Sequence, residues 1–151
     1  MSAIGTLRTG HIGLNVTDLE RSLAFYGDVL GFGLIGEGKE EGRRYAFLGQ
    51  GGRLLLTLWQ QAEGGYDAGR AGLHHLAFEA ESIERVRAAE VALKARDVSF
   101  AYEGVVAHRE GSASAGIFFH DPDGTRLEIY APEGADAAEA PLGSAPTCGF
   151  F

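Results

Sequence analysis

The stretch His11-Ile12-Gly13-Leu14-Asn15-Val16 decides the fold, because His75-Leu76-Ala77-Phe78-Glu79-Ala80 repeats its pattern later in the chain. Both stretches alternate with the period of two that is typical of a strand with one buried face. A capping-box pattern at 17–20 follows the first stretch, and a capping serine, Ser82, follows the second. The chain is therefore predicted to contain two strand–helix–strand–strand–strand units.

Apolar spacing and the positions of glycines predict the bounds of the elements. Helices are expected over 19–30, where Gly31 ends the pattern, and over 83–97. Eight strands are expected, at 7–16, 32–37, 43–48, 53–60, 75–80, 98–103, 115–120 and 126–130.

The repeat also predicts the domain organisation. The chain is expected to form a single domain over 1–131, with module one at 7–60, a glycine-rich linker at 61–72 and module two at 73–131. Residues 132–151 are rich in Ala, Gly, Pro and acidic residues, which predicts a loosely ordered C-terminal tail. Docking of the terminal Phe150-Phe151 pair on a surface groove is the alternative.

Composition excludes several classes of function. The chain has 151 residues, 45% of them hydrophobic, which is enough for one sizeable core. The formal net charge of −8 argues against a nucleic-acid partner. No apolar run approaches the roughly 20 residues of a membrane-spanning helix, and the first residues lack a signal-peptide pattern. Cys148 is the only cysteine, so an internal disulfide or a CxxC centre is excluded. We therefore expect a soluble, cytoplasmic protein.

Three side chains could form a metal site. His11 and His75 occupy equivalent positions in the two repeats, on the strand face opposite the residues that pack on the helices. Glu128 lies between two apolar strand residues, so it faces the other way, where burial of a carboxylate is costly unless it is paired or bound to a metal. Two histidines and one carboxylate suit Fe(II), Mn(II) or Zn(II). Ordinary structural roles for the three residues are the alternative.

Motifs in both halves carry a family resemblance. They are His11–Val16, Asp18–Tyr26 and Gly31-Phe32 in the first half, and His75–Phe78, Phe118–Gly124 and Leu127–Ile129 in the second. Together they resemble the vicinal oxygen chelate superfamily, which includes glyoxalase I, extradiol dioxygenases, fosfomycin-modifying enzymes and bleomycin-resistance proteins. The resemblance implies an α+β fold in which two tandem βαβββ modules form a cup-shaped mixed sheet. It also implies one divalent metal ion held by His11, His75 and Glu128, with Fe²⁺ or Mn²⁺ favoured and Zn²⁺ or Ni²⁺ as alternatives.

Departures from the family patterns narrow the expected chemistry. Aligning the last strands of the two repeats places Leu55 opposite Glu128, where glyoxalase I carries a fourth, carboxylate ligand. Fosfomycin-modifying enzymes use a hydroxyl where Gly13 stands, together with a basic cluster that this chain lacks. The extradiol dioxygenase signature is matched loosely around His108, with Phe118 at the position expected for Tyr.

The resemblance therefore implies a metal-dependent enzyme that acts on a small molecule with vicinal oxygens, with dioxygenase-like chemistry preferred. A glyoxalase-type lyase or a fosfomycin- or bleomycin-type resistance protein, including a non-catalytic drug-binding module, is the alternative.

His108 is a candidate acid/base group, or else a solvated loop histidine. Tyr130 is a candidate pocket residue, or else an ordinary packing residue. His74 is expected to point away from the metal, because adjacent strand residues face opposite sides. Family members commonly pair modules between chains, so a homodimer is expected.

Overall fold

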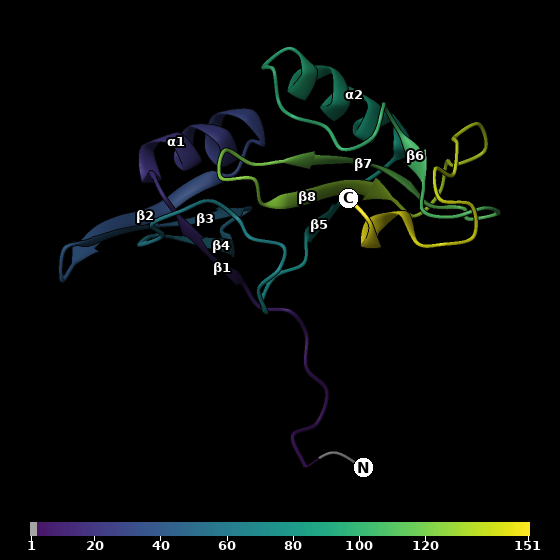
Figure 1. Ribbon diagram of the computed structural model, residues 1–151. Coiled ribbons are helices and arrows are strands. Elements are labelled where there is room, and N and C mark those ends of the chain that lie inside the picture. The colour runs from purple at the N-terminus through teal and green to yellow at the C-terminus, as the bar shows by residue number, and fades with distance from the viewer. Residues whose placement is uncertain (1–2) are drawn as a thin grey trace. The chain divides into compact units, whose positions relative to one another are not determined.

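A computed structural model describes residues 3–151 and divides the chain into two compact units, with the boundary between Gly65 and Tyr66. Each unit contains one four-stranded sheet and one main helical segment (Figure 1). The expected α+β fold with two repeated modules is confirmed. Within residues 3–151, no helix combines the length and hydropathy that crossing a bilayer requires.

The first unit is a mixed sheet in the order β1-β4-β3-β2. Its strands are β1 (Ile12–Val16), β2 (Gly33–Glu40), β3 (Arg43–Gln50) and β4 (Arg53–Gln60). β1 runs parallel to β4, and the other neighbours are antiparallel. The side chain of Asp18 caps α1 (Leu19–Leu23), which continues as the π-helical segment η1 (Ala24–Val29). Leu19 and Tyr26 are fully buried in the core of this unit.

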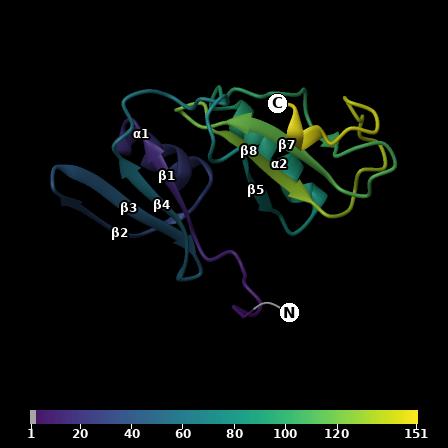
Figure 2. The ribbon, with the colours of Figure 1, turned by 60° about the horizontal axis from the view of Figure 1, so that its bottom comes forward.

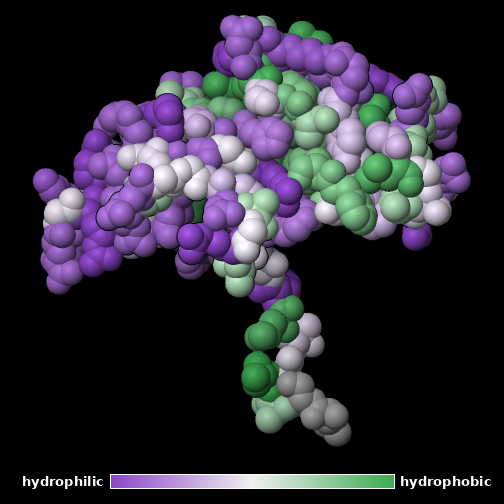
Figure 3. All heavy atoms as spheres, in the orientation of Figure 1, coloured by the Kyte–Doolittle hydropathy of each residue, from purple (hydrophilic) through white to green (hydrophobic). Residues whose placement is uncertain are grey.

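The second unit repeats this plan in the order β5-β8-β7-β6. Its strands are β5 (Leu76–Glu79), β6 (Val106–Ala107), β7 (Ala115–His120) and β8 (Arg126–Ala131). α2 (Ile83–Lys94) begins at Ser82, whose hydroxyl accepts from the Arg85 amide, and covers one face of β7 and β8 (Figure 2). Its outer side is mostly hydrophilic (Figure 3), so the helix has one buried face.

The C-terminal residues pack on the sheet face opposite α2 (Figures 1 and 2). The short helix η2 (Thr147–Gly149) begins at Thr147, which is fully buried. The Thr147 amide donates to the His108 carbonyl at 2.8 Å, and its hydroxyl donates to the Ala107 carbonyl at 2.7 Å. The prediction of a loosely ordered tail is therefore wrong. These contacts join residues that are far apart in the chain, so they produce no periodic pattern in the sequence from which they could be predicted.

Two predicted strands also differ from the structure. Residues 98–103 form no regular strand, and only Phe100 makes an isolated bridge, to Phe119. The chain bends away toward Gly104, whose φ of +67° favours glycine, and the pairing with β7 resumes at β6. In the first unit, residues 7–11 are exposed and β1 begins only at Ile12.

Candidate metal centre

Strand pairing places Glu128 on the face that carries the C-terminal residues. Glu128 lies opposite Phe118 across β7 and β8, and the Phe118 ring lies 4.9 Å from the Phe151 ring. Ala77 of β5 is its partner on the other side. Only 3% of Glu128 is exposed, so its carboxylate requires a polar or cationic partner.

His108 is such a partner. Its Nε2 lies 2.9 Å from Glu128 Oε2, and its Nδ1 lies 2.7 Å from the Ser114 hydroxyl. The hydrogen bond to Glu128 raises the pKa of His108, although desolvation opposes the shift. The alternative of a solvated loop histidine is therefore wrong. The Tyr130 ring lies 5.5 Å from the His108 ring, which places Tyr130 on the same face as predicted. The Tyr130 hydroxyl donates to Glu79 at 3.2 Å.

A chain of hydrogen bonds sets the tautomer of His75. His74 Nε2 lies 3.2 Å from the Gly149 carbonyl, and His74 Nδ1 lies 2.8 Å from His75 Nδ1. A carbonyl only accepts, so His74 Nε2 carries the hydrogen and the Nδ1 of neutral His74 accepts from His75 Nδ1. His75 Nε2 then keeps its lone pair, as a metal ligand must.

Burial lowers the pKa of His75; the Glu128 charge opposes this shift, and His74 and Arg126 reinforce it. The neutral form that binds metals is thereby favoured. His74 contacts the Nδ1 of His75 and is not among the residues whose ligand atoms cluster, so the expectation that it points away from the metal stays a prediction. Both histidines precede β5, which begins at Leu76, so the alternation of a strand does not apply to them.

A third potential ligand comes from the C-terminal residues. His75, Glu128 and Cys148 each offer one ligand atom, and these atoms lie within 4.8 Å of one another. Burial raises the pKa of the Cys148 thiol, and the Glu128 charge adds to the effect. An imidazole nitrogen, a carboxylate and a thiol form a donor set that suits borderline divalent ions. Sequence reasoning missed Cys148, because a lone cysteine in an aperiodic tail carries no spacing signal.

His11, the remaining predicted ligand, belongs to the first unit. It is exposed and lies immediately before β1. The structure thus brings together His75, Glu128 and His108 within the second unit, with Tyr130 on the same face.

The register of the sheets corrects the position equivalent to Glu128. Gly13 pairs with Thr57 in the first unit as Ala77 pairs with Glu128 in the second, so Thr57 is the counterpart of Glu128. Placing Leu55 there is wrong by two residues. Thr57 is 4% exposed, and its hydroxyl accepts from the indole of Trp59 at 3.0 Å. The first unit therefore places no carboxylate at this position.

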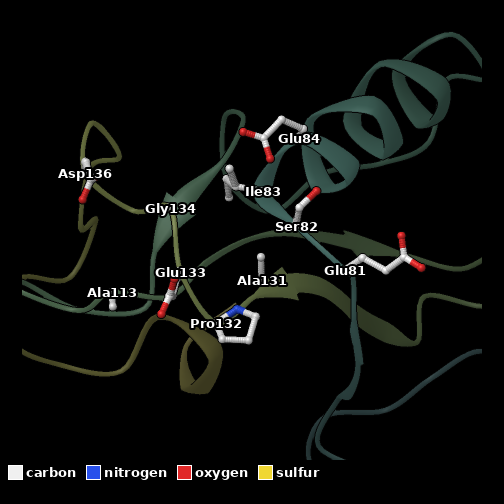
Figure 4. A pocket seen from close by; sticks show the side chains of 10 residues that line it. All are labelled: Glu81, Ser82, Ile83, Glu84, Ala113, Ala131, Pro132, Glu133, Gly134 and Asp136. Atoms are coloured by element: carbon white, nitrogen blue, oxygen red, sulfur yellow. The ribbon is translucent and has the colours of Figure 1, made fainter.

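A separate pocket lies at the N-terminus of α2 (Figure 4). Its lining includes four acidic residues, Glu81, Glu84, Glu133 and Asp136. Their carboxylates point in different directions and do not converge on one point (Figure 4). None of the predicted site residues lines this pocket.

Comparison with known proteins identifies the family. The model of the Glyoxalase/Bleomycin resistance protein/Dioxygenase superfamily matches residues 8–129. The chain belongs to this superfamily. The match includes His11, His75 and Glu128 but ends before the C-terminal residues that carry Cys148.

The chain is similar to individual superfamily members, and it covers a different share of each one's length. The chain is 32% identical over 132 residues to the uncharacterized protein YaeR of Escherichia coli (strain K12), covering 84% of this chain and 98% of that protein. It is 28% identical over 124 residues to catechol-2,3-dioxygenase of Bacillus subtilis (strain 168), covering 81% of this chain but only 40% of that protein.

A solved structure supports the fold of this superfamily member. The glyoxylase/bleomycin resistance protein/dioxygenase domain from Frankia sp. EAN1pec matches it with a TM-score of 0.74 and 24% identity. The match covers 88% of this chain and 96% of that chain. At this level of identity, the likeness concerns the fold alone.

Proposed function

We propose that the protein is a metal-dependent enzyme that acts on a small molecule with vicinal oxygens, with dioxygenase-like chemistry. The observation that carries this proposal is the buried Glu128 carboxylate, which lies close to the neutral His75 imidazole on one sheet face. Both are donors that Fe²⁺ and Mn²⁺ accept, and Zn²⁺ and Ni²⁺ are the alternatives. His11 is the third proposed ligand.

A bound divalent ion would supply Lewis-acid chemistry, holding vicinal oxygens and stabilising negative charge on them. His108 holds a proton on Nε2, directed at Glu128, and is the proposed acid/base group. The Ser114 hydroxyl fixes the other ring nitrogen, so the imidazole keeps its orientation. Tyr130 is the proposed pocket residue beside it.

Two observations favour dioxygenase-like chemistry over a glyoxalase-type lyase. Thr57 stands where the repeat would place a second carboxylate, so a four-ligand set of two histidines and two carboxylates is incomplete. The similarity to the Bacillus subtilis dioxygenase points the same way, although the chain spans only 40% of that protein.

A resistance-type module that only binds a drug-like ligand is the second candidate. It is favoured by the half-buried aromatic rings of Tyr130 and Phe151 on the site face, which suit a planar apolar ligand. Such a binder would hold its ligand without turning it over.

Metal analysis and substrate screening test the proposal together. Protein loaded anaerobically with Fe²⁺ is mixed with a panel of catechols, and oxygen uptake is recorded. Uptake above background supports dioxygenase-like chemistry. Background uptake with turnover of a 2-oxoaldehyde–thiol adduct or of fosfomycin would replace it with the lyase or resistance function. Binding without turnover would support the drug-binding module.

We also propose that the protein is a homodimer, because β2 and β5 are sheet edges that pairing between chains would cover. Light scattering is expected to give twice the 16.0 kDa mass of one chain. A concentration-independent monomer mass would contradict this assembly.

A further inference from the structure

The C-terminal residues 145–151, here called the C-terminal strap, are held on the site face at several points. Thr147 is anchored to the carbonyls of Ala107 and His108. The Tyr102 hydroxyl donates to the Thr147 carbonyl at 3.1 Å. The Gly149 carbonyl accepts from His74 at 3.2 Å. These bonds lie on either side of Cys148, so they hold in place the backbone that carries its thiol.

Ring contacts hold the end of the strap against the same site. The Phe151 ring lies 4.9 Å from the Phe118 ring and 5.8 Å from the His75 ring. The Arg126 guanidinium lies 5.8 Å from the centre of the Phe151 ring, within the range of a cation–π interaction. The strap therefore contacts His75 directly, and its Gly149 carbonyl orders the hydrogen bonds that leave His75 Nε2 free.

We propose that Cys148 is an additional metal ligand, which the C-terminal strap supplies to His75 and Glu128. This inference rests on the proposed function, because it uses the same two ligands. When a divalent ion binds, the Cys148 S–H bond breaks, its proton passes to solvent and the thiolate forms the bond to the ion. The strap lies outside the residues that the superfamily model matches, so this ligand belongs to the chain's own C-terminal segment.

A thiolate changes which ions the site prefers. Soft sulfur ligands favour Zn²⁺ and similar borderline ions, whereas Mn²⁺ and Mg²⁺ prefer oxygen ligands. Cys148 would also occupy a coordination position, so that two positions of an octahedral ion remain for vicinal oxygens while the strap is docked, and O₂ would bind beside them only when the strap is detached. The strap would thus set both the metal preference and the number of positions open to ligands.

Co²⁺ binding to the full chain tests the proposal without relying on activity. Cys148 is the only cysteine, so any thiolate-to-cobalt charge-transfer band must come from it. Anaerobic titration is expected to produce this band until one Co²⁺ is bound per site, and bound Co²⁺ is expected to protect the thiol from a thiol-specific reagent. In Cys148→Ser, Co²⁺ still binds but the band is absent. The matched control is Phe150→Ser, on an exposed side chain of the strap, which keeps the band.

The possible failures can be told apart. If wild-type protein binds Co²⁺ without the band, and its thiol reacts equally fast with and without the ion, Cys148 is not a ligand and the proposed function stands. If wild-type protein binds no Co²⁺ and elemental analysis detects no other bound metal, the metal-dependent function fails and this inference fails with it.

Discussion

Replacing Thr147 by Val tests whether the buried hydroxyl holds the C-terminal strap in place. The Thr147 side chain is fully buried, and its hydroxyl donates to the buried Ala107 carbonyl at 2.7 Å. Removing the hydroxyl leaves this buried carbonyl without its donor, which costs roughly 1–2 kcal/mol in total. Thr147→Val should therefore weaken docking of the strap by about 1–2 kcal/mol, equivalent to a factor of about 5–30 in the detached population.

Hydrogen exchange measures this effect directly. The Thr147 amide donates to the His108 carbonyl, and the substitution leaves this backbone amide in place, so its exchange reports detachment of the strap in both proteins. Exchange in the variant should be faster by roughly the same factor of 5–30. The control is Thr6→Val, at an exposed residue, which should leave this amide unchanged. An unchanged exchange rate in Thr147→Val would refute the anchoring role of the hydroxyl.

Three further substitutions test the site. His75→Ala removes a proposed ligand and should reduce the metal content found by elemental analysis to near background, whereas Val91→Ala on the exposed side of α2 should not. Thr57→Val should lower the free energy of unfolding by about 1 kcal/mol, because the Trp59 indole loses its hydrogen-bond acceptor, whereas Thr6→Val at an exposed residue should not. His108→Ala should lower the free energy of unfolding of metal-free protein by about 3 kcal/mol in urea titrations, because the buried carboxylate loses its partner. An unchanged midpoint would show that another group neutralises that carboxylate.

Periodicity predicted most of the strands and the face of Glu128, because alternation is a local property of the sequence. It could not identify Thr57 as the counterpart of Glu128. A shift of two residues keeps every side chain on the same face, so only the cross-strand pairing distinguishes Thr57 from Leu55. The hydrogen bond between His74 and His75 was not predictable for a related reason, since alternation holds only within a strand and β5 begins two residues after His74.

The C-terminal strap was beyond prediction by pattern. Thr147 is buried through bonds to residues about forty positions earlier, and nothing in its own neighbours signals this. Cys148 likewise becomes a potential ligand only once the strap docks. His108 was recognisable as a titratable group, but its pairing with Glu128 joins residues twenty positions apart, and no local pattern in the sequence signals such a contact.

The counterpart positions Thr57 and Glu128 have a consequence for how the chain tolerates mutation. Thr57 accepts a hydrogen bond from the Trp59 indole within its own strand, so an apolar replacement there removes one hydrogen bond between two neutral groups. Glu128 contacts His108, and one of its oxygens lies within 4.8 Å of ligand atoms of His75 and Cys148, so a change of charge there affects every neighbour at once. In a saturation-mutagenesis experiment, the first module should therefore accept apolar replacements of similar volume at this position, while the second should reject almost all replacements.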